Sequence, residues 1–127
     1  KNGKGFYEYL DNGDKQLWPE LMTLYPPQSE QPSQQDLIDR LLFIQANESA
    51  KCYEENVVRS VADTNVGSIF GWGFAPQHGG TLQFINAMGL DTFIARSREL
   101  ATIYGERFEP AQILLDMSDK GEVFSDD

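Results

Sequence analysis

The chain has 127 residues, enough for one hydrophobic core and too few for two ordinary domains. Hydrophobic residues make up 40% of it, which excludes an intrinsically disordered chain, and no apolar run has the length that a membrane span needs. The formal net charge of −10 repels phosphate backbones and anionic lipid heads, so we expect no nucleic-acid partner.

The first 35 residues do not have the pattern of a helical core. Residues 1–9 combine two glycines with three aromatics and show neither a secretory signal nor an initiator Met, so we expect the chain to begin inside a longer protein. Residues 10–35 are polar and rich in proline, which predicts a linker. Within this linker, the apolar side chains of residues 17–25 recur at helical spacing and predict one short helix.

Residues 36–58 carry the strongest helical pattern. One broad side, which we expect to be buried, collects Leu37, Ile38, Leu41, Leu42, Cys52, Tyr53 and Val57. The opposite arc carries Arg40, Asn47, Lys51 and Glu54. Two interpretations of this arc stay open: a solvated helix face, or the lining of a polar groove or domain interface.

A short helix is predicted over residues 62–70, followed by an aromatic, glycine-rich loop over residues 71–80. The loop opens like a dinucleotide-binding fingerprint, but the pattern ends on proline where a third glycine is needed, and no strand precedes it, so we reject a Rossmann site. We expect structural roles, as a close turn around two aromatic side chains, for Gly71, Gly73, Pro76, Gly79 and Gly80.

Three further helices complete the prediction. One covers residues 81–88 and stops at Gly89; the next has Asp91 as its N-cap and ends before Gly105. The last begins at residues 108–110, with proline in its first turn, and ends at Gly121. No alternating strand pattern is convincing, so the fold class is all-α, with four to six helices.

The residue types that carry catalysis are scarce. His78 is the only histidine, and nothing specifies an activated serine or a set of zinc ligands beside it, so we interpret it as a loop residue with ordinary hydrogen bonds. Cys52 is the only cysteine, which excludes a disulfide framework and is typical of a cytoplasmic protein; we interpret it as a small buried hydrophobe.

The remaining polar residues give no catalytic pair either. We interpret as a solvated acidic end Asp116, Asp119, Glu122, Asp126 and Asp127. We therefore predict no catalytic residue and no metal ligand. As candidates for a substrate contact or an interface we keep Asn47, Arg40, Lys51 and His78.

Several motifs occur in an order that resembles a known family. They are Arg40-Leu-Leu with Asn47, Ala62-Asp63, Gly71-Trp-Gly-Phe-Ala-Pro-Gln-His-Gly-Gly80, Tyr104-Gly-Glu-Arg-Phe-Glu-Pro110 and Lys120-Gly-Glu-Val-Phe124. Together they resemble the C-terminal helical domain of L-3-hydroxyacyl-CoA dehydrogenases, of the 6-phosphogluconate/3-hydroxyacyl-CoA dehydrogenase type. The likeness is closest to the α-subunit of the multifunctional fatty acid oxidation complex, which carries two consecutive copies of that domain.

The resemblance gives the segments their expected roles. Residues 1–9 are similar to the tail that closes the first copy, residues 10–35 are the linker, residues 36–124 are the second copy, and residues 125–127 are an acidic tail. Two positions depart from the family pattern: Ala75 stands where proline is usual, and Asn56 where glycine is common.

The resemblance implies a parent enzyme of fatty acid β-oxidation that oxidises the 3-hydroxyl of an acyl-CoA to a ketone with NAD. In that family an upstream Rossmann domain carries the dinucleotide loop and the catalytic His/Glu pair, and a hydratase domain can precede it. Asn47 occupies the place of a first-copy asparagine that contacts substrate, and we do not transfer that role.

The resemblance also implies which partners the chain has. They are the Rossmann domain, the first helical copy, the acyl-CoA bound by the parent, and a second subunit in a homodimer. We therefore expect the chain alone to bind no cofactor and to be inactive. The alternative hypothesis is a non-catalytic dimerisation or scaffold module.

Overall fold

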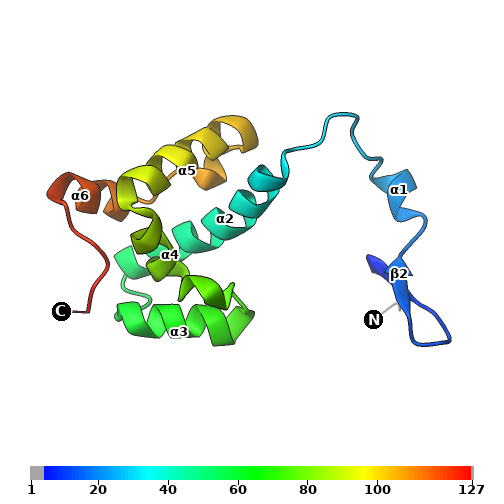
Figure 1. The fold of residues 1–127 in the computed structure, drawn as a ribbon, viewed down its shortest axis with the longest axis horizontal. Coiled ribbons are helices and arrows are strands. Elements are labelled where there is room, and N and C mark those ends of the chain that lie inside the picture. Colours follow the sequence, from blue (N-terminus) through cyan, green and yellow to red (C-terminus); the bar gives the residue numbers. More distant parts are fainter. Residues whose placement is uncertain (1–4, 127) are drawn as a thin grey trace. The chain divides into compact units, whose positions relative to one another are not determined.

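The computed structural model describes residues 5–126, and helices form most of them (Figure 1). The described part contains six α-helices and one two-stranded sheet, which confirms the all-α prediction. The chain divides into two compact units, Lys1–Pro32 and Ser33–Asp127, with a boundary inside the predicted linker. The first four residues of the predicted 1–9 tail, and Asp127 of the predicted acidic tail, lie outside the described residues.

The N-terminal unit contains a small hairpin, so the prediction that no strand occurs is wrong. Strands β1 (Tyr7–Tyr9) and β2 (Lys15–Leu17) pair antiparallel, with Glu8 opposite Gln16. Gly13 has φ of 88°, a backbone conformation that glycine adopts without strain, and it closes the turn. Strands of three residues are too short for an alternating pattern to stand out in the sequence.

Helix α1 (Leu21–Leu24) follows the hairpin. The predicted helix over residues 17–25 is thus shorter at its N-terminal end, because Leu17 belongs to β2 and pairs with Tyr7. Pro19 lies between the two elements, and its ring prevents it from donating a ladder hydrogen bond, so the strand ends there.

Helix α2 (Gln34–Glu54) opens the C-terminal unit, and the Ser33 hydroxyl caps it by accepting from the backbone N–H of Asp36 at 3.0 Å. The side predicted to be buried is largely exposed: Leu41 is 66% exposed, whereas Phe43 is 1% exposed. The buried residues of α2 are Asp39, Phe43, Ala46, Asn47, Ser49 and Ala50. The predicted orientation was wrong because the two alanines let neighbouring helices approach closely, and that side therefore enters the core.

Helix α3 (Val61–Trp72) is longer than predicted, so the assignment of Gly71 to a loop is wrong. The helix ends at Gly73, which has a left-handed conformation with φ of 79°. At its other end the carboxylate of Asp126 accepts from the backbone N–H groups of Val61 and Ala62, at 2.5 and 2.7 Å. Asp126 is therefore a cap for the positive end of α3, not part of a solvated acidic end.

A 3₁₀ turn, η1 (Pro76–His78), leads into α4 (Thr81–Met88), whose bounds are those predicted. Helix α5 (Leu90–Tyr104) follows after Gly89, which occupies the N-cap position predicted for Asp91. Asp91 lies instead in the first turn of α5, where its carboxylate accepts a hydrogen bond from the hydroxyl of Ser118.

The last helix, α6 (Gln112–Lys120), begins later than predicted and ends, as predicted, at Gly121. Residues 108–110 do not start it, because a 3₁₀ turn, η2 (Glu106–Phe108), and an extended segment precede it. That extended segment is held by the side chain of Asn47 from α2.

An aromatic cluster fills the core between α2, α4 and α5. The rings of Phe43 and Phe93 stack with their centroids 4.4 Å apart, and Phe84 meets Phe43 edge to face at 5.7 Å. Phe74, from the turn after α3, packs against Phe84. These geometries are the favourable ones for aromatic pairs, so the cluster fixes the mutual orientation of three helices. Within residues 5–126, no helix is both long and apolar enough to cross a membrane.

Candidate functional site

Asn47 is buried, and its side-chain amide bonds backbone groups through both its nitrogen and its oxygen. Only 1% of it is exposed; its Nδ2 donates to the carbonyl of Glu109 at 2.6 Å, and its Oδ1 accepts from the N–H of Ala111 at 2.8 Å. The side-chain amide thus pairs with the segment before α6 as a neighbouring strand would. The interpretation as part of a solvated face is wrong for Asn47, because this part of the arc faces residues of the same chain.

Arg40 and Lys51 lie on the same side of α2 but do not share a pocket with Asn47. The guanidinium of Arg40 lies over the ring of Tyr104, 4.4 Å from its centroid, and lines a shallow hollow with Leu37 and Leu41. The ammonium of Lys51 is 2.7 Å from the carboxylate of Glu48, one turn away. The polar arc is therefore divided among separate contacts.

His78 lies in η1 and contacts aromatic rings. Its imidazole is half-buried and meets Phe84 edge to face, with 5.0 Å between centroids, and it lies 6.1 Å from the ring of Phe74. The predicted loop position is correct in outline, since η1 is a single 3₁₀ turn. The ring packs on the core cluster as a hydrophobic side chain would.

Gly80 is where the chain passes closest to α3. Its φ is 109°, and a Cβ atom there would lie 2.5 Å from the Cα of Asn65. The approach brings the Oδ1 of Asn65 to the N–H groups of Leu82 and Gln83, at 2.9 and 3.0 Å. Asn65 therefore caps α4 from another helix, a role that sequence reasoning missed; the signal was a helix start at glycine, without a side chain to cap it.

The glycines at the end of α3 do not fit a dinucleotide. Gly71 is helical and Gly73 is the C-cap, so the free backbone groups there are carbonyls at the negative end of the helix dipole. A pyrophosphate needs the opposite end, where N–H groups point outward. Gly79, with φ of 74°, ends η1, and a Cβ there would lie 3.0 Å from Cγ of Gln83.

A charged cluster joins the start of α2 to α5. The Arg96 guanidinium contacts Asp36 at 2.7 Å and Asp39 at 2.8 Å, and the hydroxyl of Tyr104 donates to Asp36 at 2.5 Å. The hydrogen bonds from Tyr104 and Arg96 lower the pKa of Asp36, and the same bond from Tyr104 raises the pKa of that phenol. The cluster is a clamp between two helices and was not predicted, because its members lie about 60 residues apart in the chain.

An open groove of about 570 Å³ lies between α2 and α3. It is lined by Ile44, Gln45, Glu48, Ser49, Cys52, Val58, Asp63, Thr64, Gly67, Gly71 and Trp72. Both helices pack on α4 and make few direct contacts with each other (Figure 1). The indole N–H of Trp72 donates to Oε1 of Gln45 at 2.9 Å and joins the two walls at one end. Cys52 is half-buried in this groove and not in the core.

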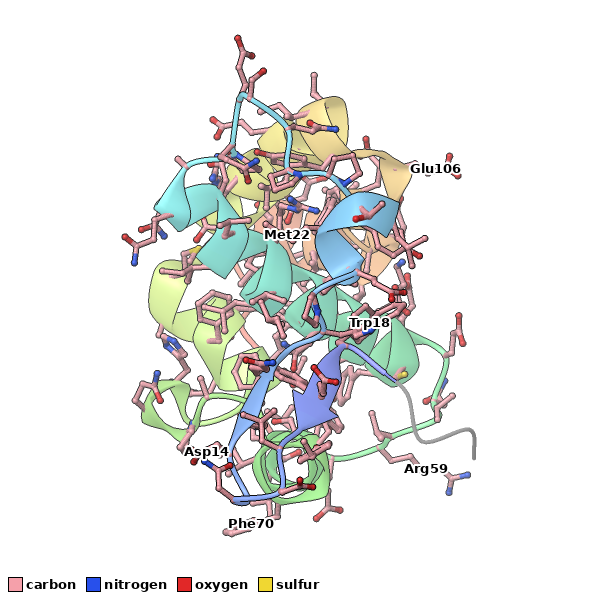
Figure 2. The ribbon with its side chains drawn as sticks, turned by 90° about the vertical axis from the view of Figure 1, so that its right-hand side faces the viewer. Asp14, Trp18, Met22, Arg59, Phe70 and Glu106 are labelled. Atoms are coloured by element: carbon pink, nitrogen blue, oxygen red, sulfur yellow. The ribbon has the colours of Figure 1, made fainter. Side chains whose placement is uncertain are left out.

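Both helices also carry exposed apolar side chains outside the groove lining. On α3, Val66 is 55% exposed and Phe70 is 85% exposed, and Figure 2 shows Phe70 projecting outward from the helix. On α2, Leu37 and Leu41 are also exposed. Exposed apolar side chains that gather on a small domain are typical of a site of interaction.

Among residues 5–126, no group of three or more His, Cys, Asp or Glu side chains is placed to hold a metal ion. A scan against protein families finds no family model that matches the sequence.

Proposed function

We propose that the chain is the helical C-terminal part of an NAD-dependent L-3-hydroxyacyl-CoA dehydrogenase of fatty acid β-oxidation, working in the cytoplasm. Its contribution is structural: it packs beside the catalytic domain, borders the side where the acyl-CoA lies, and forms an interface. The order of the motifs from Arg40 to Phe124 supports this proposal.

The open groove between α2 and α3 is the observation that carries the proposal. Helices α2 and α3 both pack on α4 and leave an apolar trough between them. The unfavourable exposure of this trough to water ends only when another surface fills it. The polar candidates meanwhile serve internal contacts: Asn47 holds the segment before α6, and His78 packs on Phe84. A domain of this build supplies surfaces to a partner.

In this proposal the redox chemistry belongs to other parts of the parent enzyme. The glycines after α3 do not suit a pyrophosphate, so NAD and the acid–base pair would be held by the Rossmann domain. The acyl-CoA would reach this chain only through the parent, because 20 acidic residues against 10 basic ones make a poor surface for the phosphates of coenzyme A.

The direct test is NADH formation from an L-3-hydroxyacyl-CoA, followed by absorbance, for the isolated chain and for the parent protein that contains it. We expect turnover by the parent and none by the chain. Turnover by the isolated chain, or an inactive parent with an intact NAD site, contradicts the proposal.

The groove also suits the alternative, a non-catalytic dimerisation or scaffold module. The coding sequence upstream of Lys1 separates the two proposals. A strand followed by a GxGxxG loop, with a later His/Glu pair, supports the dehydrogenase. A parent without these features supports the scaffold.

A further inference from the structure

The groove between α2 and α3 has the form of a helix-binding site. Its walls are two stripes of residues spaced by one helical turn: Ile44, Glu48 and Cys52 on α2, and Asp63, Gly67 and Gly71 on α3. Each stripe covers two turns, or about 12 Å. A trough of this length between two helices accepts the apolar face of a third helix.

The α3 wall of the groove contains two glycines, which have no side chains to project into it. Gly67 and Gly71 lie one turn apart, and a Cβ atom built at either would meet no other atom within 4 Å. Glycine destabilises a helix relative to alanine. At these two positions the absence of a side chain leaves open space beside α3. A helix backbone can approach α3 closely at this stripe.

Charge selects the class of occupant. The charged residues lining the groove are Glu48 and Asp63, and neither lysine nor arginine is among its described lining. Lys51 already pairs with Glu48, whereas Asp63 takes part in no ion pair within residues 5–126. A second copy of this chain, with the same rim and a net charge of −10, meets like charges here, so charge favours a basic partner.

We infer that the α2–α3 groove binds an amphipathic helix of a neighbouring domain in the parent protein, with leucine-like side chains on one face and lysine or arginine along its flanks. The apolar face fills the trough between Ile44 and Gly67, and the basic flanks meet Glu48 and Asp63. This inference rests on the proposed function, in which another part of the parent protein covers the groove, but its test needs no dehydrogenase activity, so the two can fail separately.

The probe is a fluorescent helical peptide of about 14 residues, with leucines at i, i+3, i+4 and i+7 and lysines beside them; a second peptide replaces each lysine by glutamate. We expect the full chain to bind the lysine peptide at least about tenfold more tightly than the glutamate peptide, as measured by fluorescence anisotropy. Bound peptide also slows alkylation of Cys52, the chain's only thiol.

Two variants with matched controls make the test specific. Gly67→Leu fills the trough and should lower the affinity for the lysine peptide at least about tenfold. Ala62→Leu, on the same helix but outside the groove, should leave that affinity unchanged. The pair Glu48→Lys and Asp63→Lys should reverse the preference between the peptides, whereas Glu106→Lys should keep it.

Three outcomes would overturn the inference. The lysine peptide does not bind, or both peptides bind equally, or Gly67→Leu leaves binding unchanged while its melting temperature shows a folded protein. A dimer that sedimentation detects and that Gly67→Leu abolishes would assign the groove to a second copy, which also contradicts a basic partner.

Discussion

Three asparagines carry the contacts that join distant parts of the C-terminal unit. Asn47 binds both sides of Pro110, Asn65 caps α4, and Asn86 exchanges two hydrogen bonds with the backbone of Phe124. A primary amide offers a donor and an acceptor side by side, as a peptide group does. Each asparagine therefore satisfies a backbone segment that lacks a partner of its own.

Replacing Asn47 by alanine leaves the carbonyl of Glu109 and the N–H of Ala111 without their partner in a buried site. We expect Asn47→Ala to lower the free energy of unfolding by about 2–4 kcal/mol, because one buried and one part-buried hydrogen bond are lost. Urea denaturation followed by circular dichroism measures it. Glu54→Ala, at an exposed position on the same helix, is the control and should change stability little. Equal stability of the two variants would contradict the structural role of the Asn47 hydrogen bonds.

Adding a side chain at Gly80 and adding one at Gly67 should have opposite effects on stability. A valine at Gly80 has φ of 109° and a Cβ 2.5 Å from Asn65, so Gly80→Val should destabilise by more than about 1 kcal/mol. Gly67 is helical with open space around it, so Gly67→Ala should stabilise by about 0.5–1 kcal/mol. Thermal melts of both variants test the pair, and an unchanged Gly80→Val melting temperature would refute the close approach.

At the scale of elements, the sequence predicted where helices occur better than which side of a helix is buried. Residues 81–88 were bounded correctly because Gly80 and Gly89 flank them. The buried side of α2 was misplaced because hydrophobicity alone favours leucine, whereas packing selected Phe43 and two alanines. The hairpin and the caps from Asn65 and Asp126 depend on contacts between distant residues, which periodicity does not encode.

For the candidate site, too, the sequence predicted the elements but not the contacts between distant residues. The four polar residues chosen from the sequence were located on the correct elements, but partners far along the chain determine what each does, as with Asn47 and Glu109. The groove was not predicted, although two of its lining glycines, Gly67 and Gly71, are visible in the sequence at a spacing of one helical turn.

The clamp between α2 and α5 makes stability depend on pH. The pKa of Asp36 is lowered in the folded chain, so its contribution is fully present above the unfolded pKa of about 4 and is lost as the pH falls through the folded pKa. Tyr104→Phe removes the main cause of this shift. We expect Tyr104→Phe to be less stable than the parent sequence near neutral pH, with a difference that narrows as Asp36 becomes protonated.

Thermal melts between about pH 7 and pH 2 measure this difference. Tyr53→Phe is the matched control, because the ring of Tyr53 packs edge to face on Phe124, away from the clamp. Its stability difference should not follow the pH in this way. A Tyr104→Phe difference that stays constant over the whole range would contradict the role of Asp36.

At the scale of the whole molecule, the C-terminal unit has a closed core and an open side. Phe43, Phe84 and Phe93 close the core between α2, α4 and α5, while α2 and α3 leave the apolar groove uncovered. Stability and interaction are thus assigned to different faces of α2. The account rests on the groove being covered when the chain works inside its parent protein.

Cys52 reports on that cover directly, because the single thiol of the chain lies in the groove. The measurement is the rate of Cys52 alkylation by iodoacetamide, followed by mass spectrometry of its peptide, in the isolated chain and in the parent protein. We predict rapid labelling in the isolated chain and labelling at least about tenfold slower in the parent. Equal rates in the two proteins would show an uncovered groove and would contradict the account.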